Sequence, residues 1–287
     1  MQTQRLIERN PRAPHHITSC TQTSKKGGEK ESHTPQPPPP HPPPHTRTHT
    51  TAPARETPTG ETEWTINGRY TGVTDLPLTP KGEQQVLGSG RALVGAGKLI
   101  DPARLARVYV SPRTRAQRTF ELLFPAHSQA DLHAAARVTT TAALAEWDYG
   151  EYEGLLTAEI RARRAAKGLD ADAGRPWDIW RDGCEGGESA AEVTARLDAL
   201  IAEIRALQAP CMRGGETPAD VVLVAHGHLL RAFTKRWLQY PMEFPLSMML
   251  EPGGVGVLSY QHHSVDEPAF LLGMALPVQD EKGHHKH

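Results

Sequence analysis

Short apolar runs of strand length recur along the second and last thirds of the chain. They lie at residues 106–110, 137–144, 221–225, 255–261 and 269–276. The run VVLVA at 221–225 is apolar at every position, which is typical of a strand buried on both faces of a parallel sheet. The pattern therefore predicts a sheet that contains residues 221–225 in its interior.

Segments with the helical spacing of apolar residues lie between or before these runs. They cover residues 79–94, 113–124, 156–168, 189–204 and 228–238. Thr79 followed by Pro80 is a typical helix start, and Ser189 with Glu192 forms a capping box. Strands that alternate with helices predict an α/β fold, here a three-layer α/β/α sandwich with a mostly parallel sheet.

The first 60 residues depart from this pattern. They hold eight hydrophobic residues, no aromatic residue, and 12 of the 25 prolines, which is too little apolar surface to offset the entropy of an ordered chain. We therefore predict a disordered Pro-, His- and Thr-rich segment over 1–59, a folded domain over 60–276 and a disordered tail over 277–287. The proline runs within 37–44 favour polyproline II, which allows either a weak SH3-type partner or a solvated tail without one.

Composition and charge exclude several classes of protein. The chain of 287 residues has a formal charge of −1, so no electrostatic attraction to nucleic acid or to an anionic membrane is expected. No apolar run approaches the roughly 18 residues that span a bilayer, and the N-terminus lacks the apolar core of a secretory signal. Three widely spaced cysteines predict neither a disulfide framework nor a metal cluster. The expected location is the cytoplasm, with the nucleus as an additional one, and the sequence does not indicate an oligomeric state.

Polar side chains directly follow three of the predicted strands. They are Arg113 and Arg115 after the first, Glu146 after the second, and His226 and His228 after the third. Ligands of parallel sheets bind at the carboxyl ends of strands. Arginines match phosphate oxygens, a histidine at a helix start can donate to an anion, and a carboxyl in apolar surroundings can donate a proton. Together these residues predict phosphoryl transfer from a small phosphate ester without a metal, although each of them alone is equally compatible with a structural role.

Several strings carry a family resemblance. Five segments of the chain resemble the histidine phosphatase (phosphoglycerate mutase-like) superfamily: GETEW (60–64), YTGVTDLPLT (70–79), SPRTRAQRT (111–119), EWDYGEYEG (146–154) and VAHGH (224–228). Two longer segments resemble the fungal sedoheptulose-1,7-bisphosphatase branch of that superfamily: RPWDIWRDGCEGGES (175–189) and GGVGVLSYQHHSVDEP (253–268). The resemblance covers about residues 60 to 275.

The resemblance implies a phosphatase that acts on a sugar bisphosphate through a phosphohistidine, without metal or cofactor. It implies that Arg115 holds the phosphoryl group, that Glu146 is the proton donor, and that His226 is the second histidine of the pocket. The implied binding residues for the phosphate ester, besides Arg115 and His226, are Gly60, Thr62, Tyr70, Gly227, His228 and Arg231. A phosphoglycerate mutase or a broad sugar phosphatase of the same superfamily is the alternative enzyme, and a non-catalytic phosphate-binding protein is the alternative of another class.

One departure from the family pattern is severe. The superfamily places an apolar strand and R-H-G before the ETEW string, and that histidine is the nucleophile. Here Pro58 and Thr59 stand at the arginine and histidine positions, and TTAPARETP (50–58) has two prolines and no large apolar residue. We therefore expect one core strand to be absent and the chain as written to be inactive. Because that strand would also position the pocket, replacing Pro58 and Thr59 alone is expected to restore little activity.

Two accounts of this departure stay open. In the favoured one, a low-complexity segment foreign to the domain joins it at Gly60, as at a mispredicted first exon. In the other, the protein is a pseudophosphatase that retains a phosphate-binding pocket. The segment between Leu238 and Gly253 is also short for this branch, which leaves the region that covers the substrate undefined.

Overall fold

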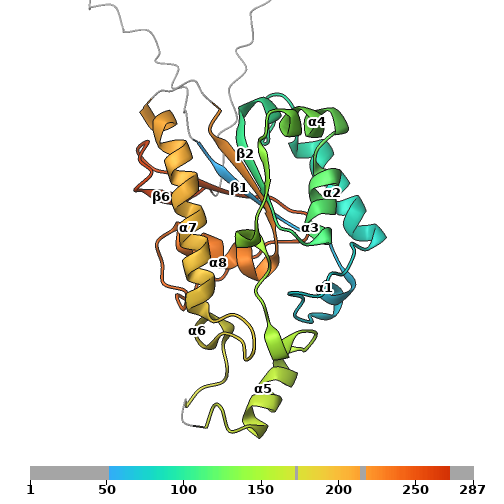
Figure 1. Cartoon of the computed structure of the whole chain (residues 1–287), viewed down its shortest axis with the longest axis vertical. Helices are drawn as coiled ribbons and strands as arrows, with labels where there is room; N and C mark the ends of the chain where they lie inside the picture. Colours follow the sequence, from blue (N-terminus) through green and yellow to red (C-terminus); the bar gives the residue numbers. More distant parts are fainter. Residues whose placement is uncertain (1–51, 172–173, 214–217, 272–287) are drawn as a thin grey trace, which may run out of the picture. The chain divides into compact units, whose positions relative to one another are not determined.

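A mixed sheet lies at the centre of the computed structural model, which describes residues 52–171, 174–213 and 218–271. Within these residues the sheet has six strands in the order β3-β2-β4-β1-β5-β6. Strands β1, β2 and β6 are labelled in Figure 1. Their bounds are β1 Ala54–Pro58, β2 Leu105–Val110, β3 Val138–Thr140, β4 Asp220–Ala225, β5 Gly256–Tyr260 and β6 Pro268–Phe270. β1 to β4 pair in parallel, and β5 and β6 add an antiparallel edge. The predicted α/β class with a mostly parallel sheet is confirmed.

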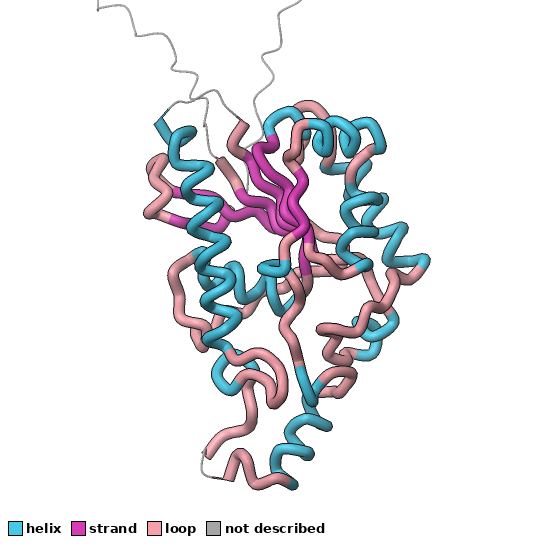
Figure 2. The backbone as a smooth tube through the Cα atoms, in the orientation of Figure 1, coloured by secondary structure: helices cyan, strands magenta, loops and turns pink. Residues whose placement is uncertain are grey.

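Helices cover both faces of the sheet (Figure 2). The helices are α1 Glu63–Asn67, α2 Pro80–Leu93, α3 Thr114–Leu123, α4 Ala126–Ala134, α5 Thr157–Ala166, α6 Ile179–Asp182, α7 Ala190–Gln208 and α8 Gly227–Trp237. α7 begins after the predicted capping box, in which the Ser189 hydroxyl accepts from the backbone of Glu192. Helices α1, α4 and α6 lack a strong apolar period, and the sequence did not predict them.

The alternation of side chains along β4 divides the core into two layers. Val222 and Val224 pack into the cluster that contains residues of α2, α3 and α4. Val221 and Leu223 pack on the opposite face with residues of α7 and α8. The continuous apolar run therefore reflects burial on both faces, as the sequence predicted.

The predicted absence of a core strand before Gly60 is wrong. Residues 54–58 form β1, all five are buried, and they pair in parallel with β4 from Ala54↔Val221 to Pro58↔Ala225. On its other side β1 pairs with β5. The predicted start of the folded domain at residue 60 is therefore too late. Disorder and a foreign origin were predicted for the preceding residues, of which 1–51 lie outside the described residues, as do 272–287.

β1 is compatible with a buried position because its two ionisable side chains have partners and prolines lie only at its margins. Pro53 precedes the strand, and Pro58 is its last residue. The Arg55 guanidinium forms a buried ion pair with Asp220, 2.9 Å between Nη1 and Oδ2. Glu56 accepts hydrogen bonds from the Thr234 hydroxyl of α8. Composition alone did not predict this strand, since these partners are more than 150 positions away in sequence.

Two further strand predictions need correction. The strand predicted at 137–144 covers only Val138–Thr140, because a 3₁₀ turn over Ala142–Leu144 follows. At the C-terminal end, β6 stops at Phe270, and most of the strand predicted at 269–276 lies outside the described residues.

Substitution of Arg55 by methionine is expected to lower the free energy of unfolding by about 3 kcal/mol, because it leaves the Asp220 carboxylate buried without its nearest cation. Burial raises the pKa of Asp220 and lowers that of Arg55, and each charge opposes the shift of the other. Urea unfolding of the two proteins measures the difference. Arg118→Met is the control, since the Arg118–Glu83 pair lies at the surface and its loss should cost about 1 kcal/mol or less. Equal, small effects of both substitutions would contradict the prediction.

Candidate active site

A cavity of about 480 Å³ opens where β1, β2 and β4 end. Its lining includes nearly all the residues implied by the sequence: Thr62, Tyr70, Arg115, Glu146, His226, Gly227, His228 and Arg231, together with Pro58 and Thr59. Gly60 and Arg113 are not among its lining residues. Gly60 has a packing role instead, since a Cβ there would lie 2.6 Å from the carbonyl oxygen of Gly82 in α2.

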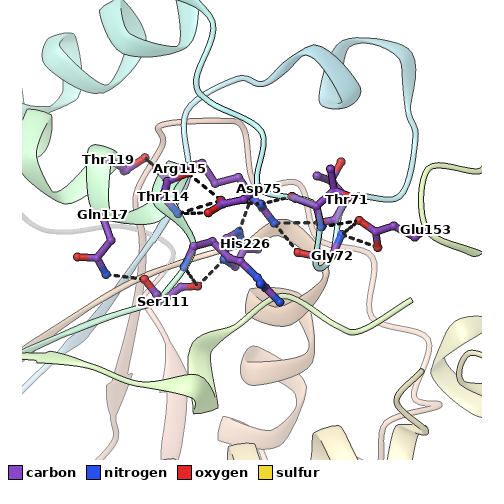
Figure 3. A network of polar contacts seen from close by, with 12 residues as sticks. Thr71, Gly72, Asp75, Ser111, Thr114, Arg115, Gln117, Thr119, Glu153 and His226 are labelled. Carbon is purple, nitrogen blue, oxygen red and sulfur yellow. Dashed lines mark hydrogen bonds and ion pairs between the residues drawn. The ribbon is translucent and has the colours of Figure 1, made fainter. Parts of the chain in front are cut away.

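His226 is held by two hydrogen bonds at the end of β4 (Figure 3). Its Nε2 lies 2.7 Å from the Ser111 hydroxyl, and its Nδ1 accepts from Nε of Arg115 at 3.2 Å. Burial and the nearby arginines hold the pKa of His226 well below its usual range. His226 is therefore neutral in this arrangement, with its proton on Nε2. A phosphate dianion beside it would favour the charged form, because an opposite charge favours ionisation.

Arg115 links α3 to the loop that borders the cavity. Its guanidinium donates to the carbonyl oxygens of Thr71, Gly72 and Thr74, in addition to His226 (Figure 3). It is buried, and Asp75 lies 3.8 Å away as its nearest carboxylate among the ion pairs of the described residues. Arg115 thus holds the loop in place and also lines the cavity. A bound phosphoryl group would compete with the loop carbonyls for the N–H groups of Arg115.

The Glu146 carboxyl lies at the N-terminus of α8. Its Oε1 accepts from the backbone N–H groups of Trp147 and Leu229, and Oε2 accepts from that of His228. Burial raises the pKa of Glu146, while these N–H groups and Arg115 oppose the increase. The carboxyl therefore has a raised pKa at the cavity wall, as a proton donor requires, although it must release an N–H group to turn toward a ligand.

Thr59 directly follows β1, at the position where the sequence resemblance implies a nucleophile. Its backbone N–H donates to Ala225, and its carbonyl accepts from Gly253. The side chain is buried at the cavity, and its hydroxyl has no hydrogen-bond partner among the described residues. In the described part of the chain, no base therefore accepts a hydrogen bond from this hydroxyl, as its activation would require.

Sequence reasoning missed three residues that organise the site. Ser111 bonds to His226, Asp75 accepts from the backbone and side chain of Thr114, and Tyr149 bonds to His228. Ser111 directly follows β2, so its position at the carboxyl end of a strand was a usable signal. The partners of Asp75 and Tyr149 are 39 and 79 positions away, and no local pattern predicts such pairs.

Residues 59–267 match the sequence profile described as the histidine phosphatase superfamily, branch 1. The chain belongs to the histidine phosphatase superfamily. Sedoheptulose 1,7-bisphosphatase of Saccharomyces cerevisiae is 36% identical over 260 residues, which cover 79% of this chain and 94% of the yeast protein. An acid phosphatase of Mycobacterium tuberculosis is 35% identical over 203 residues, 71% of this chain and 84% of that protein.

Solved structures confirm the histidine phosphatase fold. The structure of an open reading frame product of Mycobacterium tuberculosis has a TM-score of 0.57 at 29% identity, and covers 77% of this chain and 95% of its own. A mycobacterial glucosyl-3-phosphoglycerate phosphatase has a TM-score of 0.56 at 23% identity, with 77% of this chain and 97% of its own covered. Among the helices of the described residues, none has the length and apolar character that a membrane crossing needs.

Proposed function

We propose that the cavity binds a sugar bisphosphate of the sedoheptulose-1,7-bisphosphate type, and that the chain with Pro58 and Thr59 binds this ligand without hydrolysing it. The observation that carries the proposal is the contrast within one cavity. Arg115, Glu146 and His226 are in place, whereas the end of β1 presents a threonine. A threonine hydroxyl without a base is a poor nucleophile.

The choice of a bisphosphate rests on the yeast relative and on Arg231. Sedoheptulose 1,7-bisphosphatase is the name of the yeast protein that covers most of this chain. Arg231 lies one helical turn past His228 and lines the cavity with residues 248–252. It comes from α8, whereas Arg115 comes from α3, so the cavity offers a second guanidinium for a second phosphate. A phosphoglycerate, as a phosphoglycerate mutase would use, offers Arg231 a carboxylate but no second phosphate.

We propose that this chain derives from metal-independent phosphatases that act through a phosphohistidine. In that reaction Arg115 and His226 would stabilise the transferring phosphoryl group and Glu146 would protonate the leaving oxygen. We propose the cytoplasm as the location. The nuclear location and the SH3-type partner for residues 37–44 stay predictions.

Isothermal titration of the full chain with sedoheptulose 1,7-bisphosphate tests the proposal. We expect measurable binding, phosphate release at background level, and at least about 10-fold weaker binding by Arg115→Met, because charge-assisted bonds to phosphate are the strong ones. Arg118→Met is the matched control on the same helix, since its side chain pairs with Glu83 at the surface. Thermal melting confirms that each variant is folded, because Arg115 also ties the loop.

Three results would contradict the proposal. Absence of binding by the unchanged, folded chain would exclude a retained ligand site. Preference for a three-carbon monophosphate would exclude the sugar-bisphosphate class. Steady phosphate release by the unchanged chain would show that another residue acts as the nucleophile.

A further inference from the structure

Tyr149 forms a short hydrogen bond with a histidine of the cavity wall. Its hydroxyl oxygen lies 2.7 Å from Nδ1 of His228. Tyr149 is 1% exposed, and it follows Glu146 in the segment that leads from β3 past the cavity. Binding of the phosphoryl group by Arg115 and His226 does not require this contact.

The direction of this hydrogen bond is determined by the protonation states of the two side chains. Burial raises the pKa of Tyr149 well above its usual value, so the phenol carries its proton at neutral pH. Burial, together with Arg231 and Lys235, lowers the pKa of His228 to about 4, so the imidazole is neutral. A neutral imidazole has one donor and one acceptor nitrogen. Tyr149 therefore donates to Nδ1, and the proton of His228 is on Nε2.

Aromatic contacts hold the His228 ring in place. The Tyr70 ring stacks on it with centroids 5.1 Å apart, and Tyr149 and Trp180 meet it edge-on. His228 is partly exposed and lines the cavity. Within the described part of the chain Nε2 has no hydrogen-bond partner. The ring therefore offers one fixed, neutral N–H beside the stacked face of Tyr70.

We propose that Tyr149 is a positioning residue that fixes the Nε2–H tautomer of His228, and that this N–H recognises a hydroxyl or carbonyl oxygen of the sugar rather than the phosphoryl group. The proposal deepens the proposed function and rests on it for the sugar-phosphate class of ligand. Phosphoryl oxygens are matched by the charged guanidiniums of Arg115 and Arg231. A neutral donor flanked by aromatic rings instead suits the uncharged oxygen atoms and C–H groups between two phosphates.

The first experiment measures the tautomer without any ligand. In ¹⁵N-detected NMR spectra of the full chain at pH 7, His228 should show a protonated Nε2 and an unprotonated Nδ1. In Tyr149→Phe the acceptor at Nδ1 loses its donor, so the spectrum should show a mixture of tautomers or a rotated ring. An Nδ1–H tautomer in the unchanged protein, or an unaltered spectrum in the variant, would overturn the positioning role of Tyr149.

The second experiment compares ligands by titration calorimetry. Tyr149→Phe should weaken binding of sedoheptulose 1,7-bisphosphate and fructose 1,6-bisphosphate by about 3- to 10-fold, the range for one neutral hydrogen bond. Binding of inorganic phosphate should change by less than about 2-fold, since it does not engage His228. Tyr260→Phe is the matched control, because it removes a hydroxyl bond of equal length, to Gln208, outside the cavity.

His228→Gln supplies a test that does not depend on Tyr149. A glutamine amide can place a neutral N–H near the former Nε2 without a tautomer to select, so this variant should retain most of the sugar discrimination and be insensitive to a second Tyr149→Phe change.

Equal weakening of sugar phosphates and inorganic phosphate by Tyr149→Phe would overturn the proposal. Binding of the hexose but not the heptose bisphosphate would reject the proposed substrate, yet the difference between variants would still test the role of His228. If neither sugar phosphate binds more tightly than inorganic phosphate, sugar recognition by His228 is wrong as well, whatever the NMR result.

Discussion

The Pro58→Arg/Thr59→His double variant is expected to hydrolyse sedoheptulose 1,7-bisphosphate at least about 10³-fold faster than the unchanged chain. Loss of the nucleophile in a catalytic triad lowers kcat by about 10⁶-fold. The substituted residues would return a nucleophile and an additional cation to a cavity that already contains Arg115, Glu146 and His226.

The expectation of little recovery rested on the absence of a core strand, and the structure removes that premise. β1 is paired on both sides, and the backbone at Thr59 is anchored to Ala225 and Gly253. A histidine at position 59 would therefore extend from a fixed point at the cavity, and fixed geometry is what catalysis requires. A grafted apolar strand is no longer a precondition for activity.

Release of inorganic phosphate measures the gain. Pro58→Arg/Thr59→Gln is the matched control, because it restores the cation and a side chain of similar length without a nucleophile, and it should remain at background. A folded double variant that binds the bisphosphate but does not release phosphate would show that position 59 is not the missing element. Activity of the glutamine control would point to a nucleophile elsewhere.

Glu56 alone is expected to lower the free energy of unfolding by about 4 kcal/mol as the pH rises from 4 to 8. Glu56 is 1% exposed in the middle of the central strand β1, and its side-chain hydrogen-bond partner among the described residues is the Thr234 hydroxyl. Burial raises its pKa to about 8, which the hydrogen bond from Thr234 only partly offsets.

The sign follows from proton binding. In the unfolded chain the carboxyl titrates near pH 4.3, so between about pH 4.3 and pH 8 the folded state holds a proton that the unfolded state has lost. The stability contributed by Glu56 is therefore fully present below the unfolded pKa and is lost as the pH rises through the folded pKa. His226 and His228 act in the opposite direction below about pH 6.5, because their folded pKa values are lowered.

The comparison with Glu56→Gln isolates this effect, because the variant retains both histidines. The difference in unfolding free energy between the two proteins should change by about 1.4 kcal/mol per pH unit between pH 5 and pH 7, and less steeply toward pH 8. Urea unfolding at several pH values measures it. Glu63→Gln, at an exposed position of α1, should run parallel to the unchanged protein. A difference between Glu56→Gln and the unchanged protein that does not vary with pH would show that Glu56 is ionised throughout this range.

Local patterns in the sequence determined the architecture and the family. The apolar run of β4, the capping box of α7 and the alternation of strands with helices depend on residues close together in the chain, so they are readable without a structure. The motifs at 60–64, 111–119, 146–154 and 224–228 placed arginine, carboxyl and histidine side chains at one edge of the sheet. That convergence follows from the rule that parallel strands end on the same side.

Only the tertiary structure decided whether β1 exists and how the site is held. β1 has a composition that disfavours a strand, yet β4 and β5 supply its backbone partners, Asp220 pairs with Arg55, and the Thr234 hydroxyl donates to Glu56. The three backbone donors around Glu146, the loop carbonyls that engage Arg115 and the Tyr149–His228 bond likewise join positions that are mostly far apart in sequence. The energy of such pairs depends on burial and distance, which a periodic pattern does not contain.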